Sequence, residues 1–134
     1  MNLSKLEIIQ SNNNQMSWIE DIVRGLTDEY KLKSPYDLCR QLRISIIRLE
    51  PNSPILCDTS SRYFRNYKGH ETIFIKDDLF GYDEEHILRH QLGHAILHPN
   101  MCDSLAIHSD KADNEADYFG EILRKIKIDI IGRN

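Results

Sequence analysis

The stretch that decides the fold is residues 83–99, Asp-Glu-Glu-His-Ile-Leu-Arg-His-Gln-Leu-Gly-His-Ala-Ile-Leu-His-Pro. Three acidic residues open it, where the helix dipole favours negative charge, and Pro99 closes it. Apolar residues occupy most of the remaining faces, and a helix that is apolar nearly all round is a buried helix. The sequence therefore predicts a buried helix over residues 83–98, and the histidines inside it need partners.

Two of these histidines, His90 and His94, lie four residues apart, so their imidazoles point the same way, one helical turn apart. That arrangement suits two ligands of one tetrahedral zinc ion. The spacing alone is not specific, because His86 and His98 extend the same ladder in both directions. Gly93 adds context: a glycine inside a helix costs about 1 kcal/mol against alanine, which indicates close approach by another element.

A catalytic zinc site needs a third protein ligand and an open position for water. A second helix, expected over residues 110–127, supplies three acids: Asp113, Glu115 and Asp117. Asp113 and Asp117 share one face of this helix, whereas Glu115 lies almost opposite to Asp113, so we expect only one of these faces to look at the zinc. By helical periodicity Glu115 is nearer the apolar side, and it remains open as the alternative third ligand.

The rest of the chain predicts a small α+β fold with N-terminal helices and a three- to four-stranded sheet. One helix is expected to begin near Ser17, with Ser17 as its cap, and another at Ser34-Pro35. Nothing divides residues 1–134 into more than one domain. Short runs rich in β-branched or aromatic residues predict the strands, two of them strong (residues 44–49 and 72–75) and two weak (residues 55–57 and 62–67).

Composition excludes several classes of protein. A net charge of −4, without a cluster of five basic residues, does not favour direct binding to nucleic acid. No apolar run approaches the roughly 20 residues of a membrane span, and residues 1–15 lack the pattern of a signal peptide. Cys39, Cys57 and Cys102 are widely spaced and form no CxxC pair, which indicates reduced thiols. We expect a cytoplasmic protein that contacts neither a membrane nor nucleic acid directly.

Taken together, these features resemble the ImmA/IrrE metallo-endopeptidases. The resemblance rests on His-x-x-x-His with Leu-Gly inside it, on the Ile-Leu-His-Pro that follows, and on the acidic helix with Glu-Ala-Asp-Tyr-Phe, and it spans roughly residues 30–124. It implies a minimal zincin-like domain with an active-site helix, a C-terminal metal-ligand helix and bound Zn²⁺. By resemblance, His90 and His94 are metal ligands. Asp113 matches the position of the metal-binding acid, usually a glutamate, and Asp117 that of a partner which orients a ligand histidine.

The resemblance also implies a function. Several members of the family act on helix-turn-helix repressors of phages and mobile elements, so the expected partner is such a repressor. Their general base is a glutamate that takes the proton of a water which zinc makes more acidic. Gln91 stands at that position here, and an amide cannot accept a proton at neutral pH. We therefore expect a zinc metallopeptidase slowed by about 10²–10⁴.

Alternatives remain open. The chain can be a non-catalytic, zinc-containing protein that titrates a repressor or antitoxin, or a structural domain without metal. Gln91 itself has two explanations. One is a deliberate isosteric substitution of glutamate that inactivates an intact protein, and the otherwise maintained zinc site favours it. The other is a natural lineage that lost catalysis and kept binding, and the aspartate at position 113 favours it.

Substrate handling is expected to follow the thermolysin-like pattern, in which an extended peptide adds to the edge of the sheet. Residues 72–75 are the expected edge strand, although an ordinary core strand fits the same pattern. Four side chains are candidate hydrogen-bond donors to an oxyanion, and each can equally be a surface or packing residue: Tyr82, His98, His108 and Tyr118.

Overall fold

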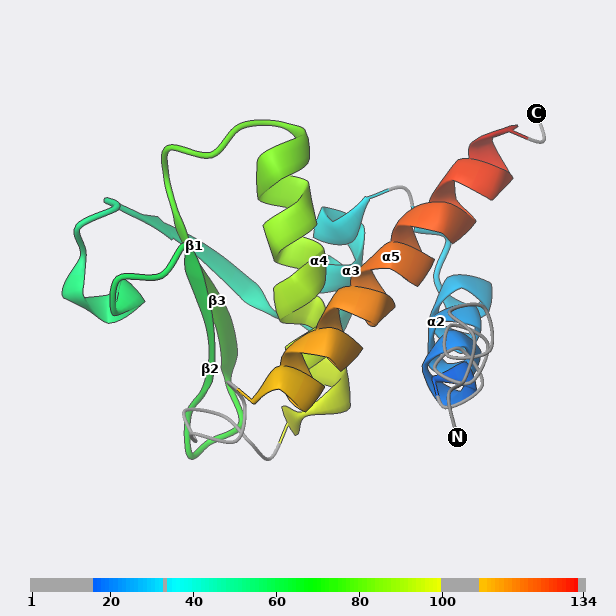
Figure 1. Cartoon of the computed structure of the whole chain (residues 1–134), viewed down its shortest axis with the longest axis horizontal. Helices are drawn as coiled ribbons and strands as arrows, with labels where there is room; N and C mark the ends of the chain where they lie inside the picture. The colour runs from blue at the N-terminus through cyan, green and yellow to red at the C-terminus, as the bar shows by residue number, and fades with distance from the viewer. Residues whose placement is uncertain (1–15, 33, 100–108, 133–134) are drawn as a thin grey trace, which may run out of the picture.

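The computed structural model describes residues 16–32, 34–99 and 109–132, with side chains as far as residue 126. Within these ranges the chain forms the predicted α+β fold, in which α-helices pack on a small three-stranded sheet (Figure 1). The elements in chain order are α2 (Ser17–Glu29), α3 (Pro35–Leu42), β1 (Ser45–Leu49), the 3₁₀ helix η1 (Pro54–Leu56), β2 (Ser61–Arg65), β3 (Glu71–Lys76), α4 (Tyr82–Leu97) and α5 (Asp110–Gly132).

The first two described helices begin in different ways. α3 has the predicted cap: the Ser34 hydroxyl accepts a hydrogen bond from the backbone N–H of Asp37 at 3.4 Å. α2 has Met16 in the cap position and no side-chain cap bond, so the capping role predicted for Ser17 is wrong. Ser17 is already the first helical residue, and α2 is held by the apolar face that it packs into the core.

The sheet has the strand order β1-β3-β2, with β1 parallel and β2 antiparallel to β3. β3 is therefore the central strand, and the prediction that residues 72–75 form an edge is wrong, because both neighbours pair with it. The weak candidate at residues 62–67 forms β2, which ends at Arg65. The other weak candidate, residues 55–57, is wrong: Pro54 begins a 3₁₀ helix there, and proline lacks the N–H that a strand ladder needs.

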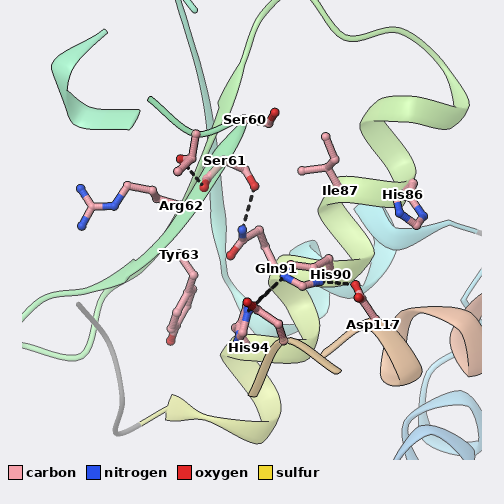
Figure 2. Close-up of a pocket in the computed structure, with 12 residues that line it drawn as sticks. Ser60, Ser61, Arg62, Tyr63, His86, Ile87, His90, Gln91, His94 and Asp117 are labelled. Carbon is pink, nitrogen blue, oxygen red and sulfur yellow. Dashed lines mark hydrogen bonds and ion pairs between the residues drawn. The ribbon is translucent and has the colours of Figure 1, made fainter. Parts of the chain in front are cut away.

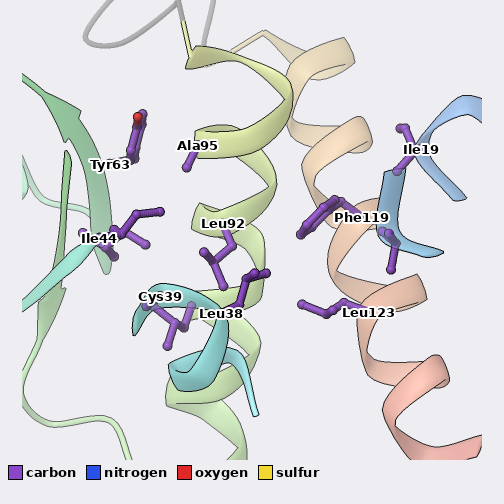
Figure 3. Close-up of a cluster of buried hydrophobic side chains, with 12 residues drawn as sticks. Ile19, Leu38, Cys39, Ile44, Tyr63, Leu92, Ala95, Phe119 and Leu123 are labelled. Carbon is purple, nitrogen blue, oxygen red and sulfur yellow. The ribbon is translucent and has the colours of Figure 1, made fainter. Parts of the chain in front are cut away.

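α4 is the central element of the fold and has nearly the predicted bounds, Tyr82–Leu97. It packs against the sheet on one side and against α5 on the other (Figures 1 and 3). Leu88 and Leu92 of α4 are fully buried, and Phe119 of α5 is buried between α4 and α2. The core cluster therefore draws on every layer: Ile19, Val23, Leu38, Cys39, Ile44, Tyr63, Ile73, Leu88, Leu92, Ala95, Phe119 and Leu123.

α4 and α5 meet closely at Gly93, and we call this line of contact the α4–α5 seam. A Cβ on Gly93 would lie 2.8 Å from both the Cα and the carbonyl oxygen of Ala116. The close approach predicted from this glycine is thus confirmed. Because the seam is so tight, side chains on either side of Ala116 can reach across to α4, and this proximity positions the site described below.

Two further expectations concern the chain as a whole. Cys39 and Cys57 are free thiols, and Cys102 lies outside the described residues. Among the helices that the structure describes, none combines the length and apolar character needed to cross a bilayer.

Candidate metal site

Three side chains converge where α4 meets the beginning of α5. His90 Nε2 and His94 Nε2 are 3.0 Å apart, and Asp113 Oδ1 lies 3.1 Å from His94 Nε2 and 3.6 Å from His90 Nε2. Neighbouring ligand atoms of a tetrahedral zinc ion, with bonds of about 2.05 Å, are about 3.3 Å apart. The observed separations bracket that value. This His-His-Asp cluster could therefore hold a metal ion.

The electrostatics of His94 suit metal binding. Its side chain is only 5% exposed, and its pKa is lowered to about 4, with burial as the largest cause. The neighbouring His90 and His98 also contribute to this lowering of the pKa, and Asp113 opposes it. His94 is therefore a neutral imidazole near pH 7, and a metal-binding histidine must be neutral. Asp113, with 43% of its side chain exposed, brings a carboxylate to the same point from the solvent side.

His90 has a carboxylate behind it. Its Nδ1 lies 2.6 Å from Asp117 Oδ1 (Figure 2). A carboxylate can only accept, so the ring nitrogen donates and His90 carries its proton on Nδ1. The lone pair of Nε2 then faces the His-His-Asp cluster. This contact has the geometry that an orienting role for Asp117 requires.

Glu115, the alternative third ligand, lies elsewhere. Its Oε1 is 2.9 Å from Nε2 of His98. The buried line of α5 that packs on α4 runs through Ala116, and Asp113 and Glu115 flank it on opposite sides. Both acids therefore reach α4, each at a different histidine, although only one face of α5 was expected to be used. The structure brings Asp113, and not Glu115, to the His-His-Asp cluster.

Gln91, which the sequence resemblance placed at a general-base position, lies beside the cluster and lines the same pocket. Its side chain points from α4 toward the sheet, where Nε2 donates a hydrogen bond of 2.7 Å to Ser61 Oγ of β2 (Figure 2). Both residues are buried. Sequence reasoning missed Ser61, because a serine at the start of a weak strand gives no local signal that it contacts a helix thirty residues later.

A pocket of about 320 Å³ opens in front of the cluster, at the lower end of the size range of ligand sites. β2 forms one of its walls, and Tyr63 on that strand donates a hydrogen bond of 2.5 Å to Glu71 Oε1. The pocket thus combines an edge strand with the two helices of the seam. Its lining residues are Thr59, Ser60, Ser61, Arg62, Tyr63, His86, Ile87, His90, Gln91, His94, Asp113 and Asp117.

The side chains predicted as oxyanion donors lie away from this pocket or outside the described residues. Tyr118 points to α2, where its hydroxyl donates to Glu20 at 2.7 Å, and Tyr82 is exposed at the beginning of α4. His98 is buried and does not line the pocket. His108 falls outside the part of the chain that the structure describes.

Comparison with known proteins places a phage protein among the relatives of this chain. The chain is 26% identical over 113 residues to "Uncharacterized immunity region protein 2" of Bacillus phage phi105, covering 81% of this chain and 68% of that protein. No protein-family model and no solved structure matches the chain. The protein described here is therefore a distant relative of a phage immunity-region protein.

Proposed function

We propose that this chain is a zinc-binding protein of the metallo-endopeptidase type, similar to the ImmA/IrrE peptidases, that acts on a helix-turn-helix repressor and is catalytically impaired at Gln91. The observation that carries the proposal is the convergence of His90 Nε2, His94 Nε2 and Asp113 Oδ1 at spacings suited to one tetrahedral metal ion, inside a pocket walled by a sheet strand. The phage immunity-region relative supports a role in phage regulation.

Each residue of the site has a definite task in this proposal. His90, His94 and Asp113 hold the metal, and Asp117 keeps His90 in the required tautomer. Bound zinc would polarise a scissile carbonyl and lower the pKa of water toward about 7. Gln91 can orient a water through hydrogen bonds but cannot take its proton. Loss of a general base lowers the rate of hydrolysis by about 10²–10⁴. The site would therefore still bind metal and substrate but hydrolyse the substrate slowly.

The substrate would lie along β2. This strand is at an edge of the described sheet and also forms a wall of the pocket beside the His-His-Asp cluster. An extended peptide can add to such an edge through main-chain hydrogen bonds. Added to β2, it would pass Ser61 and the facing Gln91, which brings a peptide bond close to the cluster. β2 thus takes the role that the sequence assigned to residues 72–75.

A second candidate function is binding without catalysis, in which the protein titrates a repressor or antitoxin and zinc is structural. The hydrogen bond from Gln91 Nε2 to Ser61 Oγ favours it. The buried amide is satisfied in place by a partner on β2, so the site is complete as a binding site with glutamine at this position.

Comparing this chain with its Gln91→Glu variant tests both proposals. Each protein is loaded with one equivalent of zinc and incubated with the helix-turn-helix repressor of the same immunity region. We expect the glutamate variant to cleave the repressor about 10²–10⁴ times faster, and His90→Ala in the same background to abolish cleavage. No hydrolysis by the zinc-loaded glutamate variant would refute the peptidase. Equal relief of repression with either residue at position 91 would support the binding protein.

A further inference from the structure

His98 and Glu115 form a buried polar pair behind the metal site, outside the pocket. His98 Nε2 is 2.9 Å from Glu115 Oε1, and the two side chains are only 5% and 15% exposed. On its other side, His98 Nδ1 lies 3.1 Å from Nδ1 of His94. The pair therefore reaches the His-His-Asp cluster from the back, through the ring of His94.

When Nε2 of His94 offers its lone pair to a metal ion, the hydrogen bonds along this row fit one placement of protons, with Glu115 as a carboxylate and His98 as a neutral ring. The Glu115 carboxylate can only accept, so the Nε2 of His98 carries a proton and donates it. The Nδ1 of a neutral His98 is then an acceptor. Nδ1 of His94, which faces it at 3.1 Å, must be the donor. With its proton on Nδ1, His94 keeps a lone pair on Nε2, the atom that faces His90 and Asp113. The Asp113 carboxylate, 3.1 Å from Nε2, favours the opposite tautomer, so the contact with His98 is what holds the proton on Nδ1.

We propose that His98 and Glu115 are positioning residues that fix the tautomer and the ring orientation of His94, so that its Nε2 is available to a divalent metal ion. The inference deepens the metal site of the proposed function and rests on it. Each metal-binding histidine then has a carboxylate behind it. Asp117 contacts His90 directly, at 2.6 Å, and Glu115 acts on His94 through His98.

If the His98–Glu115 pair were only structural, it would satisfy the buried Glu115 carboxylate and would not need to contact His94. The rings of His90, His94 and His98, however, form one continuous column along α4 and its C-cap. The centroids of His90 and His94 are 4.6 Å apart, and those of His94 and His98 are 5.3 Å apart. If Glu115 were absent, His98 could carry its proton on Nδ1 and turn His94 into the acceptor. The proton of His94 would then sit on Nε2, where it blocks a metal.

Two substitutions at position 98 separate positioning from packing. His98→Phe keeps the ring volume but offers no acceptor to His94. His98→Asn is smaller, yet its side-chain oxygen can lie where Nδ1 lies and accept the same hydrogen bond. Zinc affinity is measured by competition with a chelator, using zinc alone as the probe. We expect the phenylalanine variant to bind zinc about 10–100 times more weakly, and the asparagine variant to recover part of that loss.

The control is Tyr36→Phe, which removes a hydrogen bond of 2.6 Å to Glu84 near the other end of α4 and should leave zinc affinity unchanged. If His98→Asn binds zinc no better than His98→Phe, position 98 acts by packing and the inference is overturned. Unchanged affinity in His98→Phe overturns it as well.

Long-range ¹H–¹⁵N spectra of the unsubstituted, metal-free protein give a readout that needs neither variant to fold. They report which ring nitrogen of His94 carries the proton. A proton on Nδ1 supports the inference even if the protein binds no zinc, in which case the metal site alone fails. A proton on Nε2 overturns the inference whatever the zinc affinity.

Discussion

Replacing Gly93 with alanine tests whether the tight α4–α5 seam shapes the site. The new Cβ would lie 2.8 Å from the Cα and the carbonyl oxygen of Ala116, which are backbone atoms and cannot rotate away. The helices would have to separate by about 0.6 Å to restore an ordinary contact of 3.4 Å. Overpacking of this kind costs about 1–3 kcal/mol. Alanine in place of glycine returns about 1 kcal/mol through helix propensity, so the net loss of stability reaches up to about 2 kcal/mol.

Gly25 provides a matched control, because it lies inside α2 and an added Cβ there meets no atom within 4 Å outside its own turn of the helix. Gly25→Ala should gain the helix propensity alone, about 1 kcal/mol. Urea denaturation of both variants therefore isolates the seam: Gly93→Ala should fall below Gly25→Ala by about 1–3 kcal/mol in the free energy of unfolding. It should also bind zinc more weakly, since α4 and α5 carry different metal ligands. Stabilisation of Gly93→Ala equal to that of Gly25→Ala would refute the reasoning.

The metal site and the ion pair between Arg48 of β1 and Glu84 of α4 lead to two further predictions. Asp113→Ala should weaken zinc binding, measured against a chelator, by more than the about 10–100-fold expected when Asp117→Asn removes only an orienting contact. The reverse order would contradict the assignment of Asp113 as the ligand. The Arg48 guanidinium, 2.5 Å from Glu84, holds the pKa of that carboxyl below its usual value. Glu84 therefore stabilises the fold fully above its unfolded pKa of about 4.3, and this contribution is lost as the pH falls through the lower folded pKa. We expect the melting temperature of the unsubstituted protein to fall more on acidification than that of Glu84→Gln. Equal falls in the two proteins would contradict the prediction.

The sequence predicted the elements that local signals determine. The bounds of α4 follow from its acidic first turn, its apolar faces and Pro99, and the cap of α3 follows from Ser34. The order of the strands could not be read in the same way, because pairing joins segments far apart in the chain. β1 and β3 pair in parallel, and β2 adds antiparallel on the far side, so of the two strands with strong patterns β3 is central and β1 lies at an edge.

The choice between the two acids of α5 shows what a local pattern leaves out. Periodicity correctly put Glu115 nearer the apolar side: its side chain is 15% exposed, against 43% for Asp113. Burial alone does not decide the ligand, because His94 in the cluster is only 5% exposed. Position does: Glu115 meets His98 and does not line the pocket, whereas Asp113 does. Gly93 marks a point of close contact between α4 and α5, which helical periodicity does not give. It fixes where α5 touches α4, and acids on both flanks of that contact can then reach the histidine column. Asp113 meets the column at the pocket and Glu115 meets it behind the pocket, so two acids only two residues apart on α5 reach different histidines.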